Sequence, residues 1–202
     1  MFITVEGIEG CGKSTLLAGL SERLRDGGRE TIVTREPGGS PTGDAVRAIF
    51  IDPALVLAPL TEALLINAAR AQHVLETIEP ALHRGAIVLC DRFVDSTLAY
   101  QGYGRGIDLR FLRDLCEAAS GGREPDVTFI LDIPVAVSRE RVASRREHLD
   151  RVEREDDAFH GRVRNGYLEL ASTSPRYRVI DATKSAPEVL ADALAVLAER
   201  AA

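Results

Sequence analysis

One stretch near the start of the chain, from Gly7 to Thr15, constrains the fold more than any other feature. Its sequence, Gly-Ile-Glu-Gly-Cys-Gly-Lys-Ser-Thr, fits the pattern G-x-x-x-x-G-K-[S/T] of a phosphate-binding loop. Glycines let the backbone N–H groups curl around an anion, Lys13 adds a compact positive charge, and the Ser14 hydroxyl is placed to bind Mg2+. The stretch therefore predicts a nucleoside triphosphate site formed by Gly7, Ile8, Glu9, Gly10, Cys11, Gly12, Lys13, Ser14 and Thr15.

The flanking residues support this prediction. Residues 2–6 are rich in β-branched and aromatic side chains and predict a strand. Leu16, Leu17, Leu20 and Leu24 follow at helical spacing, so a bound phosphate would lie at the N-terminus of a helix. Lysine occurs only at positions 13 and 184, whereas arginine is common, which suggests that Lys13 is kept where a compact charge suits a phosphate.

The composition narrows the class of protein. A net charge of -6 argues against a generic nucleic-acid surface, and no apolar run approaches the length needed to span a membrane. Cys11, Cys90 and Cys116 are too few and too widely spaced for a disulfide framework or a zinc site. We therefore expect a soluble cytoplasmic protein, folded as one domain over residues 1–202, with no nucleic acid or membrane partner.

Strand and helix patterns alternate along the chain. Candidate strands cover 2–6, 30–34, 86–90, 127–131 and 177–181, and Ser185 begins a capping box that opens the last helix. Such alternation predicts an α/β fold in which a five-stranded parallel sheet is flanked by helices. Ligands of such sheets bind beyond the carboxyl ends of the strands.

The residues after the third strand, Asp91 and Arg92, indicate the type of reaction. An acid at this position can hold Mg2+, although a surface ion pair is the alternative. ATP-hydrolysing motors often carry Glu directly after this Asp, whereas Arg92 cannot act as a base. No Asn-Lys-x-Asp motif for guanine is present either. Both features favour phosphoryl transfer to a second bound molecule.

Several motifs then resemble those of the thymidylate kinases, in the same order along the chain. The segment 91–102, Asp-Arg-Phe-Val-Asp-Ser-Thr-Leu-Ala-Tyr-Gln-Gly, closely resembles that family's signature. Residues 35–39, 68–70 and the lid-like segment 146–151 also resemble family motifs, so the resemblance spans about 2 to 181. It implies a P-loop nucleoside-monophosphate-kinase fold with a mobile lid at about 145–156, in a homodimer that transfers the γ-phosphoryl group of ATP to dTMP for dTTP synthesis, with Mg2+.

The resemblance also implies roles for acceptor-site residues. Glu9 is expected near the sugar 3′-hydroxyl, Arg47 and Arg92 at the acceptor phosphate, and Tyr100 beneath the sugar. Arg70 matches the arginine that contacts the base. The full implied dTMP-binding set is Glu9, Glu36, Pro37, Arg47, Ile66, Arg70, Arg92, Thr97, Tyr100 and Gln101, while Ser14 and Asp91 are the implied metal ligands.

On the donor side, Arg141 and Arg145 lie at i and i+4 of a predicted helix, and by resemblance Arg141 stacks on adenine while Arg145 contacts phosphate. Some thymidylate kinases carry an arginine inside the phosphate loop, where this chain has Gly10. The implied catalytic residues are therefore Lys13, Arg92, Arg146 and Arg151, the last two from the lid. The dense mixed charge of 145–156 is also typical of a solvated helix face.

One position departs from the family pattern, because Ile66 stands where a phenylalanine usually stacks on thymine. Tyr103 and Arg105 lie in a glycine-rich loop that either touches substrate or forms a plain turn. The four histidines show no metal-ligand spacing and are expected at the surface or in helix packing. Two alternatives stay open: a kinase for another small acceptor, and a nucleotide-binding switch or clamp-loader-like subunit.

Overall fold

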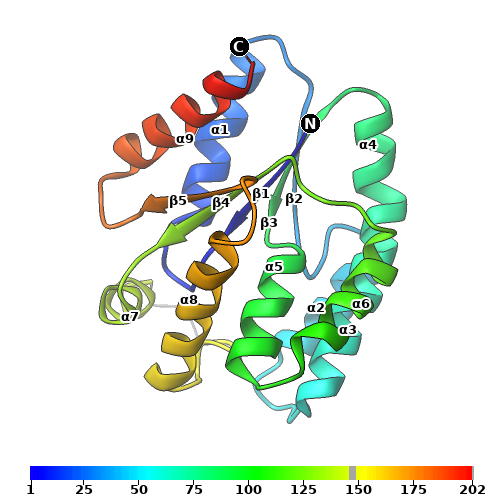
Figure 1. Cartoon of the computed structure of the whole chain (residues 1–202). Helices are drawn as coiled ribbons and strands as arrows, with labels where there is room; N and C mark the ends of the chain where they lie inside the picture. Colours follow the sequence, from blue (N-terminus) through cyan, green and yellow to red (C-terminus); the bar gives the residue numbers. More distant parts are fainter. Residues whose placement is uncertain (146–148, 202) are drawn as a thin grey trace.

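A parallel sheet with the strand order β2-β3-β1-β4-β5 forms the centre of the molecule (Figure 1). The structure is a computed structural model that describes residues 1–145 and 149–201. The strands are β1 (Phe2–Glu6), β2 (Thr31–Arg35), β3 (Ile87–Asp91), β4 (Val127–Asp132) and β5 (Tyr177–Asp181). The predicted α/β class and the five predicted strands are confirmed, each strand to within one residue at either end.

Helices cover both faces of this sheet (Figure 1). Helices α1 (Lys13–Asp26) and α9 (Ala186–Ala201) pack together on one face. The other face carries α3 (Pro59–His73), α5 (Val94–Thr97), α6 (Leu109–Ser120), α8 (Asp157–Ala171) and the π-helical turn η2 (Leu98–Gly104). The remaining elements are α2 (Pro41–Ile51), which packs on α3, the π-helical turn η1 (Val74–Ile78), α4 (Glu79–His83) and α7 (Val135–Ala143).

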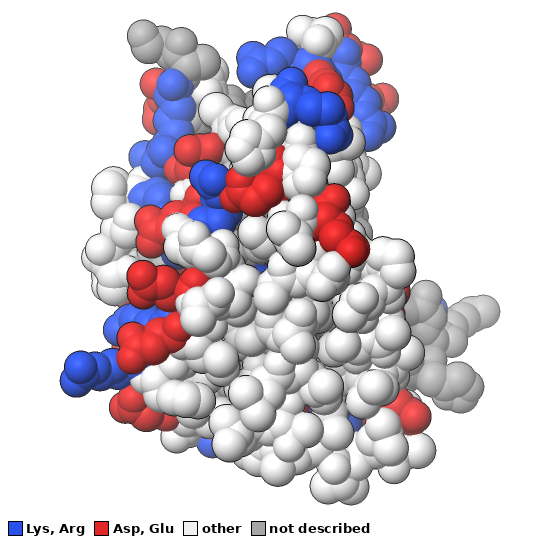
Figure 2. All heavy atoms as spheres, turned by 90° about the vertical axis from the view of Figure 1, so that its right-hand side faces the viewer, with Lys and Arg blue, Asp and Glu red and all other residues white. Residues whose placement is uncertain are grey.

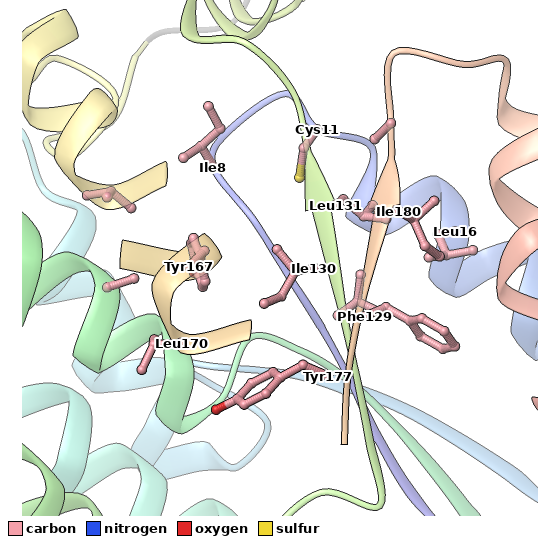
Figure 3. Close-up of a cluster of buried hydrophobic side chains, with 14 of the residues drawn as sticks. Ile8, Cys11, Leu16, Phe129, Ile130, Leu131, Tyr167, Leu170, Tyr177 and Ile180 are labelled. Atoms are coloured by element: carbon pink, nitrogen blue, oxygen red, sulfur yellow. The ribbon is translucent and has the colours of Figure 1, made fainter. Parts of the chain in front are cut away.

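The core lies on both sides of β4, as expected for a central strand. Phe129 and Ile130 are each at most 1% exposed, and they leave the strand on opposite faces because side chains alternate along it. Figure 3 shows Phe129 on the side of Leu16 from α1, and Ile130 on the side of Tyr167 from α8. Helices therefore pack against both faces of the sheet, and this packing fixes the positions of the loops that leave its carboxyl edge.

Local backbone geometry bends the chain into loops at this edge. Gly7 has a φ of 135°, and a Cβ there would lie 2.5 Å from the carbonyl oxygen of Leu131, so only glycine fits. Gly12 is the N-cap residue of α1. At the other end of the chain, the backbone N–H of Ser185 donates to Glu188 Oε2 at 3.0 Å, which confirms the predicted capping interaction of α9.

Over the described ranges 1–145 and 149–201, every helix is too short or too polar to span a membrane.

Candidate active site

A cavity of about 610 Å³ lies at the carboxyl edge of the sheet, next to the phosphate loop. Loops after β1, β2 and β3 form its wall together with residues of α2, α3, η2 and α7. The predicted site residues in this wall are Glu9, Gly10, Cys11, Gly12, Lys13, Ser14, Thr15, Glu36, Pro37, Arg47, Ile66, Arg70, Asp91, Arg92, Tyr100, Gln101, Arg141 and Arg145. Most of the residues that the sequence assigned to two substrates thus share one cavity.

Four predicted residues lie outside that wall, as far as residues 1–145 and 149–201 define it: Gly7, Ile8, Thr97 and Arg151. Gly7 and Ile8 contribute through their backbone, because their carbonyl oxygens each lie 3.4 Å from Lys13 Nζ. Arg146, with the 146–148 part of the predicted lid, falls outside the residues that the structure describes.

The side chain of Lys13 folds back onto the phosphate loop and contacts it at three atoms. Besides the two carbonyl contacts, Lys13 Nζ lies 3.8 Å from the sulfur of Cys11. Gly10 has a φ of 72°, and a Cβ there would lie 3.0 Å from the carbonyl oxygen of Ser138. The loop therefore leaves little room for an arginine at position 10, and cations must reach the phosphates from elsewhere.

Arg92 supplies such a cation from the loop after β3. Its backbone φ is 70°, and the guanidinium lies 3.0 Å from the Gly7 carbonyl oxygen and 2.9 Å from Glu9 Oε1. Hydroxyls of Tyr100 and Tyr167 lie 3.0 and 3.1 Å away. Burial would lower the pKa of Arg92, but the surrounding Tyr100, Tyr167 and Glu9 raise it well above its ordinary value. Arg92 is therefore a fixed positive charge beside the phosphate loop.

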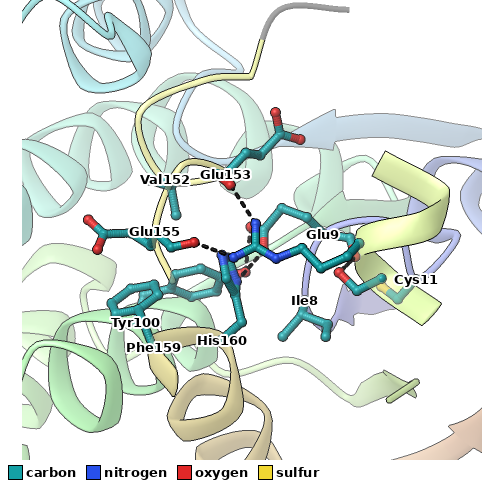
Figure 4. A network of polar contacts seen from close by, with 12 residues as sticks. Ile8, Glu9, Cys11, Tyr100, Val152, Glu153, Glu155, Phe159 and His160 are labelled. Atoms are coloured by element: carbon teal, nitrogen blue, oxygen red, sulfur yellow. Dashed lines mark hydrogen bonds and ion pairs between the residues drawn. The ribbon is translucent and has the colours of Figure 1, made fainter. Parts of the chain in front are cut away.

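Glu9 belongs to this group and also approaches His160, which Figure 4 labels beside it. The Tyr100 hydroxyl donates to Glu9 Oε1 at 2.6 Å, and His160 Nδ1 lies 3.3 Å from Oε2. Within the described residues, Oε2 has no hydrogen-bond partner. Burial would raise the pKa of Glu9, but His160, Arg92 and Lys13 lower it well below its usual range. Glu9 is thus an ionised carboxylate whose Oε2 faces His160.

On the opposite wall, Arg70 is fully buried and its donors are all used by the protein. Its Nε donates to Glu36 Oε2 at 2.8 Å, and Nη2 donates to the Phe93 carbonyl and to Thr97 Oγ1, both at 3.0 Å. Its Nη1 donates to Asn67 Oδ1 at 2.9 Å and to the sulfur of Cys116 at 3.4 Å. The structure therefore places Arg70 in the cavity wall, as predicted, but each of its N–H groups already donates to a protein atom. Thr97 lies outside the wall and accepts one of these hydrogen bonds.

A second buried carboxylate, Glu62 of α3, contacts Gln101, Arg105 and Arg151, although sequence reasoning assigned Glu62 itself no role. Gln101 Nε2 donates to it at 3.0 Å, Arg105 Nη2 lies 3.0 Å away, and Arg151 Nη1 also donates to it. Arg151 additionally donates from Nε to the Phe50 carbonyl at 3.0 Å. Arg151, predicted to face the donor phosphates, is thus held against α2 and α3 in this structure.

The donor side of the cavity holds the two predicted arginines. Arg141 Nη1 donates to the Gly10 carbonyl at 3.3 Å, and Arg145 Nη1 lies 3.3 Å from Glu153 Oε1. Lys184, the only other lysine of the chain, also lines the cavity from the loop after β5. It pairs with Asp192 at 2.8 Å, and sequence reasoning did not assign it to the site.

The predicted metal ligands fit an ion that arrives with a triphosphate. Ser14 and Asp91 line the same cavity, and Asp91 Oδ1 is buried without a hydrogen-bond partner among the described residues. Across 1–145 and 149–201 no group of three or more His, Cys, Asp or Glu side chains is arranged so that it could hold a metal ion by itself. Mg2+ commonly uses one or two protein ligands plus phosphate oxygens and water, so these two residues suit it.

Two histidines were missed by sequence reasoning. His160 is 2% exposed and faces Glu9, whereas His73 is fully buried, 3.0 Å from Glu36 Oε1 and 2.7 Å from Thr34 Oγ1. His73 lies three residues after Arg70, so helical spacing could have found it. His160 reaches Glu9 across the tertiary structure, and no local pattern marks it.

The fold and this cavity together define a class, the P-loop kinases, in which a phosphate loop and arginines from several loops surround two substrates. The family model of thymidylate kinase matches residues 5–193. A curated thymidylate kinase from Deinococcus radiodurans is 50% identical to this chain over 201 residues, which cover 99% of this chain and 97% of the relative. One from Thermomicrobium roseum is 52% identical over 194 residues, which cover 96% of this chain and 91% of the relative. A crystal structure of thymidylate kinase from Ehrlichia chaffeensis superposes with a TM-score of 0.81 at 36% identity, over 98% of both chains. The chain belongs to the thymidylate kinase family.

Proposed function

We propose that this protein transfers the γ-phosphoryl group of ATP to dTMP, giving dTDP for dTTP synthesis. The observation that carries this proposal is that the phosphate loop and the acceptor residues of α2, α3 and η2 line one continuous cavity. Two phosphates that react must meet in one enclosed space, because the transfer depends on positioning and charge neutralisation. Membership of the family makes dTMP the acceptor.

The acceptor phosphate lies between Arg47 and Arg92. Arg47 Nη1 is held by the Pro37 carbonyl at 3.2 Å, and burial lowers its pKa without removing its charge. Tyr100 packs beneath the sugar. Oε2 of Glu9, which faces His160 but has no hydrogen-bond partner among the described residues, accepts a hydrogen bond from the sugar 3′-hydroxyl. Glu36 acts through Arg70, whose side chain it holds.

The base lies against Ile66, Arg70 and Gln101. Arg70 contacts it by exchanging its weakest contact, the 3.4 Å one to Cys116 sulfur, for an oxygen of the base. Gln101 offers Oε1, which is buried and has no partner among the residues that the structure describes. Ile66 gives an aliphatic contact in place of aromatic stacking, so selection among bases rests more on the polar groups.

Charge neutralisation is the main contribution of the chain to the transfer. Lys13 leaves its loop carbonyls for the outer phosphates of ATP, Arg92 bridges toward the acceptor, and Arg141 and Arg145 lie on the donor side. Ser14 and Asp91 would hold Mg2+, which when bound neutralises further phosphate charge. Arg146 and Arg151 of the proposed lid complete the cations when the lid excludes water from the transfer.

A coupled assay tests this function. Purified protein with ATP and Mg2+ is supplied with dTMP, dUMP, dCMP or dGMP, and ADP formation is followed. We expect ADP only when an acceptor is present, with dTMP giving the highest kcat/KM. A purine monophosphate as the best acceptor would overturn the assignment, and ADP release without any acceptor would favour a nucleotide-binding switch.

We further propose that the protein is a homodimer in the cytoplasm. Figure 2 shows that the side of the molecule carrying α3, α4 and α6 has a broad area with few charged side chains. Exposed apolar residues of α3, η1 and α6 are Leu60, Leu64, Leu75 and Phe111, with exposed fractions of 44–68%. Because exposed apolar surface of this extent is unusual on a monomer, a second copy is its proposed occupant. The three free, buried cysteines suit a reducing compartment.

A further inference from the structure

Glu62 is a buried carboxylate with no assigned role in the reaction. It is 1% exposed and lies on α3 one helical turn before Ile66, so that Glu62, Ile66 and Arg70 follow one another on the same helix face. Guanidinium groups of Arg105 and Arg151 compensate its charge, since Arg105 Nε and Nη2 lie 3.2 and 3.0 Å from its oxygens. Its third partner is neutral: the side-chain amide of Gln101.

This third contact fixes the orientation of the Gln101 amide. An ionised carboxylate accepts hydrogen bonds and cannot donate them, so Gln101 must turn its NH2 group toward Glu62, where the Nε2–Oε2 distance is 3.0 Å. The amide oxygen then points away from Glu62. Gln101 is 2% exposed and lines the cavity, and within the described residues its Oε1 has no hydrogen-bond partner.

A buried acceptor without a partner is costly unless a ligand donates to it. We propose that Glu62 determines base specificity by holding Gln101 so that the acceptor pocket presents an oxygen. That oxygen matches the N3–H of thymine or uracil and opposes the unprotonated N3 of cytosine, which is itself an acceptor. The inference rests on the proposed function, because it assigns Glu62 to the base end of the same acceptor site.

Glu62 does not need to touch the base for this effect. It is absent from the cavity wall as the described residues form it, so it acts through Gln101 as a positioning residue. A glutamine at position 62 can donate as well as accept, and the Gln101 amide is then free to flip and present its NH2 group to the cavity. A flipped amide donates to the N3 of cytosine and loses its bond to thymine.

The test compares ratios of kcat/KM for dTMP, dUMP and dCMP in wild type and in Glu62→Gln. We expect the dTMP-to-dCMP ratio to fall about tenfold or more, the effect of one hydrogen bond gained or lost in a buried site. The dTMP-to-dUMP ratio stays unchanged, because both bases carry N3–H. A general loosening of the pocket would lower all three values together.

Arg105→Gln is the matched control. It removes a charged partner of Glu62 and lowers stability, but leaves the Gln101 contact in place, so the dTMP-to-dCMP ratio is expected to stay at the wild-type value. An unchanged ratio in Glu62→Gln, or an equal fall in Arg105→Gln, overturns the inference. If wild type does not phosphorylate dTMP at all, the proposed function itself fails, which is a separate outcome.

A structure of the wild-type complex decides the question if Glu62→Gln does not fold. With dTMP bound, Gln101 is expected between Glu62 and the N3 atom of thymine, within hydrogen-bond distance of both. Base contacts that bypass Gln101, or a Gln101 amide that has left Glu62, would overturn the inference.

Discussion

The guanidinium of Arg92 lies 2.9 Å from the carboxylate of Glu9, and this ion pair joins the loop after β3 to the phosphate loop after β1. Both side chains are largely buried, and Arg92 also lies over the ring of Tyr100, 4.8 Å from its centre. The cation is therefore held in place before either nucleotide binds. A charge that is already in position does not have to reorganise during the transfer. Such preorganised charges are the main source of catalysis in sites of this kind, because they stabilise the transition state.

Replacing this cation is expected to affect the reaction far more than the fold. In Arg92→Gln we expect kcat/KM for dTMP to fall on the order of 10³-fold, because one transition-state cation is lost. Steady-state kinetics with saturating ATP measure it. Arg23→Gln, at an exposed position on α1, is the control and should match wild type. A fall below tenfold in Arg92→Gln would mean that other cations neutralise the acceptor phosphate.

Ile66 offers the opposite kind of test, a gain of affinity. It is 7% exposed and lines the cavity, where an aromatic ring could stack on the base. Stacking contributes roughly 1–3 kcal/mol, part of which the aliphatic side chain already supplies. We expect Ile66→Phe to lower the KM for dTMP several-fold and Ile66→Ala to raise it. A higher KM in Ile66→Phe would show that the wall around position 66 leaves no room for a ring.

Local patterns predicted the fold and the phosphate loop, and tertiary contacts account for what was missed. The strands were found because their apolar runs and the residues after them are contiguous in the chain. His160 and Lys184 come from segments that carry no motif, and Glu62 lies behind the cavity wall, so packing rather than spacing places each of them. Arg151 has a motif, yet its partner in this structure is a carboxylate of α3 that no spacing rule connects to it.

Glu6 links stability to pH. It is fully buried at the end of β1, where the Phe93 N–H donates to it at 2.7 Å and the hydroxyl of Tyr167 at 2.9 Å. Burial, followed by the nearby charge of Asp95, raises the pKa of Glu6 from 4.5 to about 7. Between pH 4.5 and pH 7 the folded state therefore keeps a proton on Glu6 that the unfolded state has released. This bound proton stabilises the fold at low pH, and the stabilisation is lost as the pH rises through 7.

Glu6→Gln imitates the protonated form at every pH. We expect the free energy of unfolding of Glu6→Gln, relative to wild type, to rise between pH 5 and pH 8 by up to about 3 kcal/mol. Urea denaturation at intervals of one pH unit measures the difference. Glu22→Gln, an exposed carboxylate of α1, corrects for charge removal in general. Parallel curves for wild type and Glu6→Gln would show that Glu6 is ionised throughout this range.

The apolar area over α3 and α6 predicts how the dimer can be separated. Leu64 is 49% exposed on α3, and a charge placed there would be buried without a partner if a second copy covers it. We expect wild type to sediment as a dimer and Leu64→Glu to sediment as a monomer at micromolar concentration. Glu30→Gln, which lies before β2, is the control. A monomeric wild type would contradict the proposal.

Replacing Arg151 distinguishes a catalytic role of this residue from a purely structural one. In this structure its guanidinium is held by Glu62 and by the Phe50 carbonyl, so it reaches the donor phosphates only by exchanging the carboxylate for phosphate oxygens. We expect Arg151→Ala to keep dTMP affinity, measured by calorimetry, and to lose on the order of 10³-fold in single-turnover rate. Arg154→Ala, an exposed arginine of the same segment, should keep the wild-type rate. A near-normal single-turnover rate in Arg151→Ala would contradict the catalytic role. The residue would then only hold the segment after residue 149 against α2 and α3.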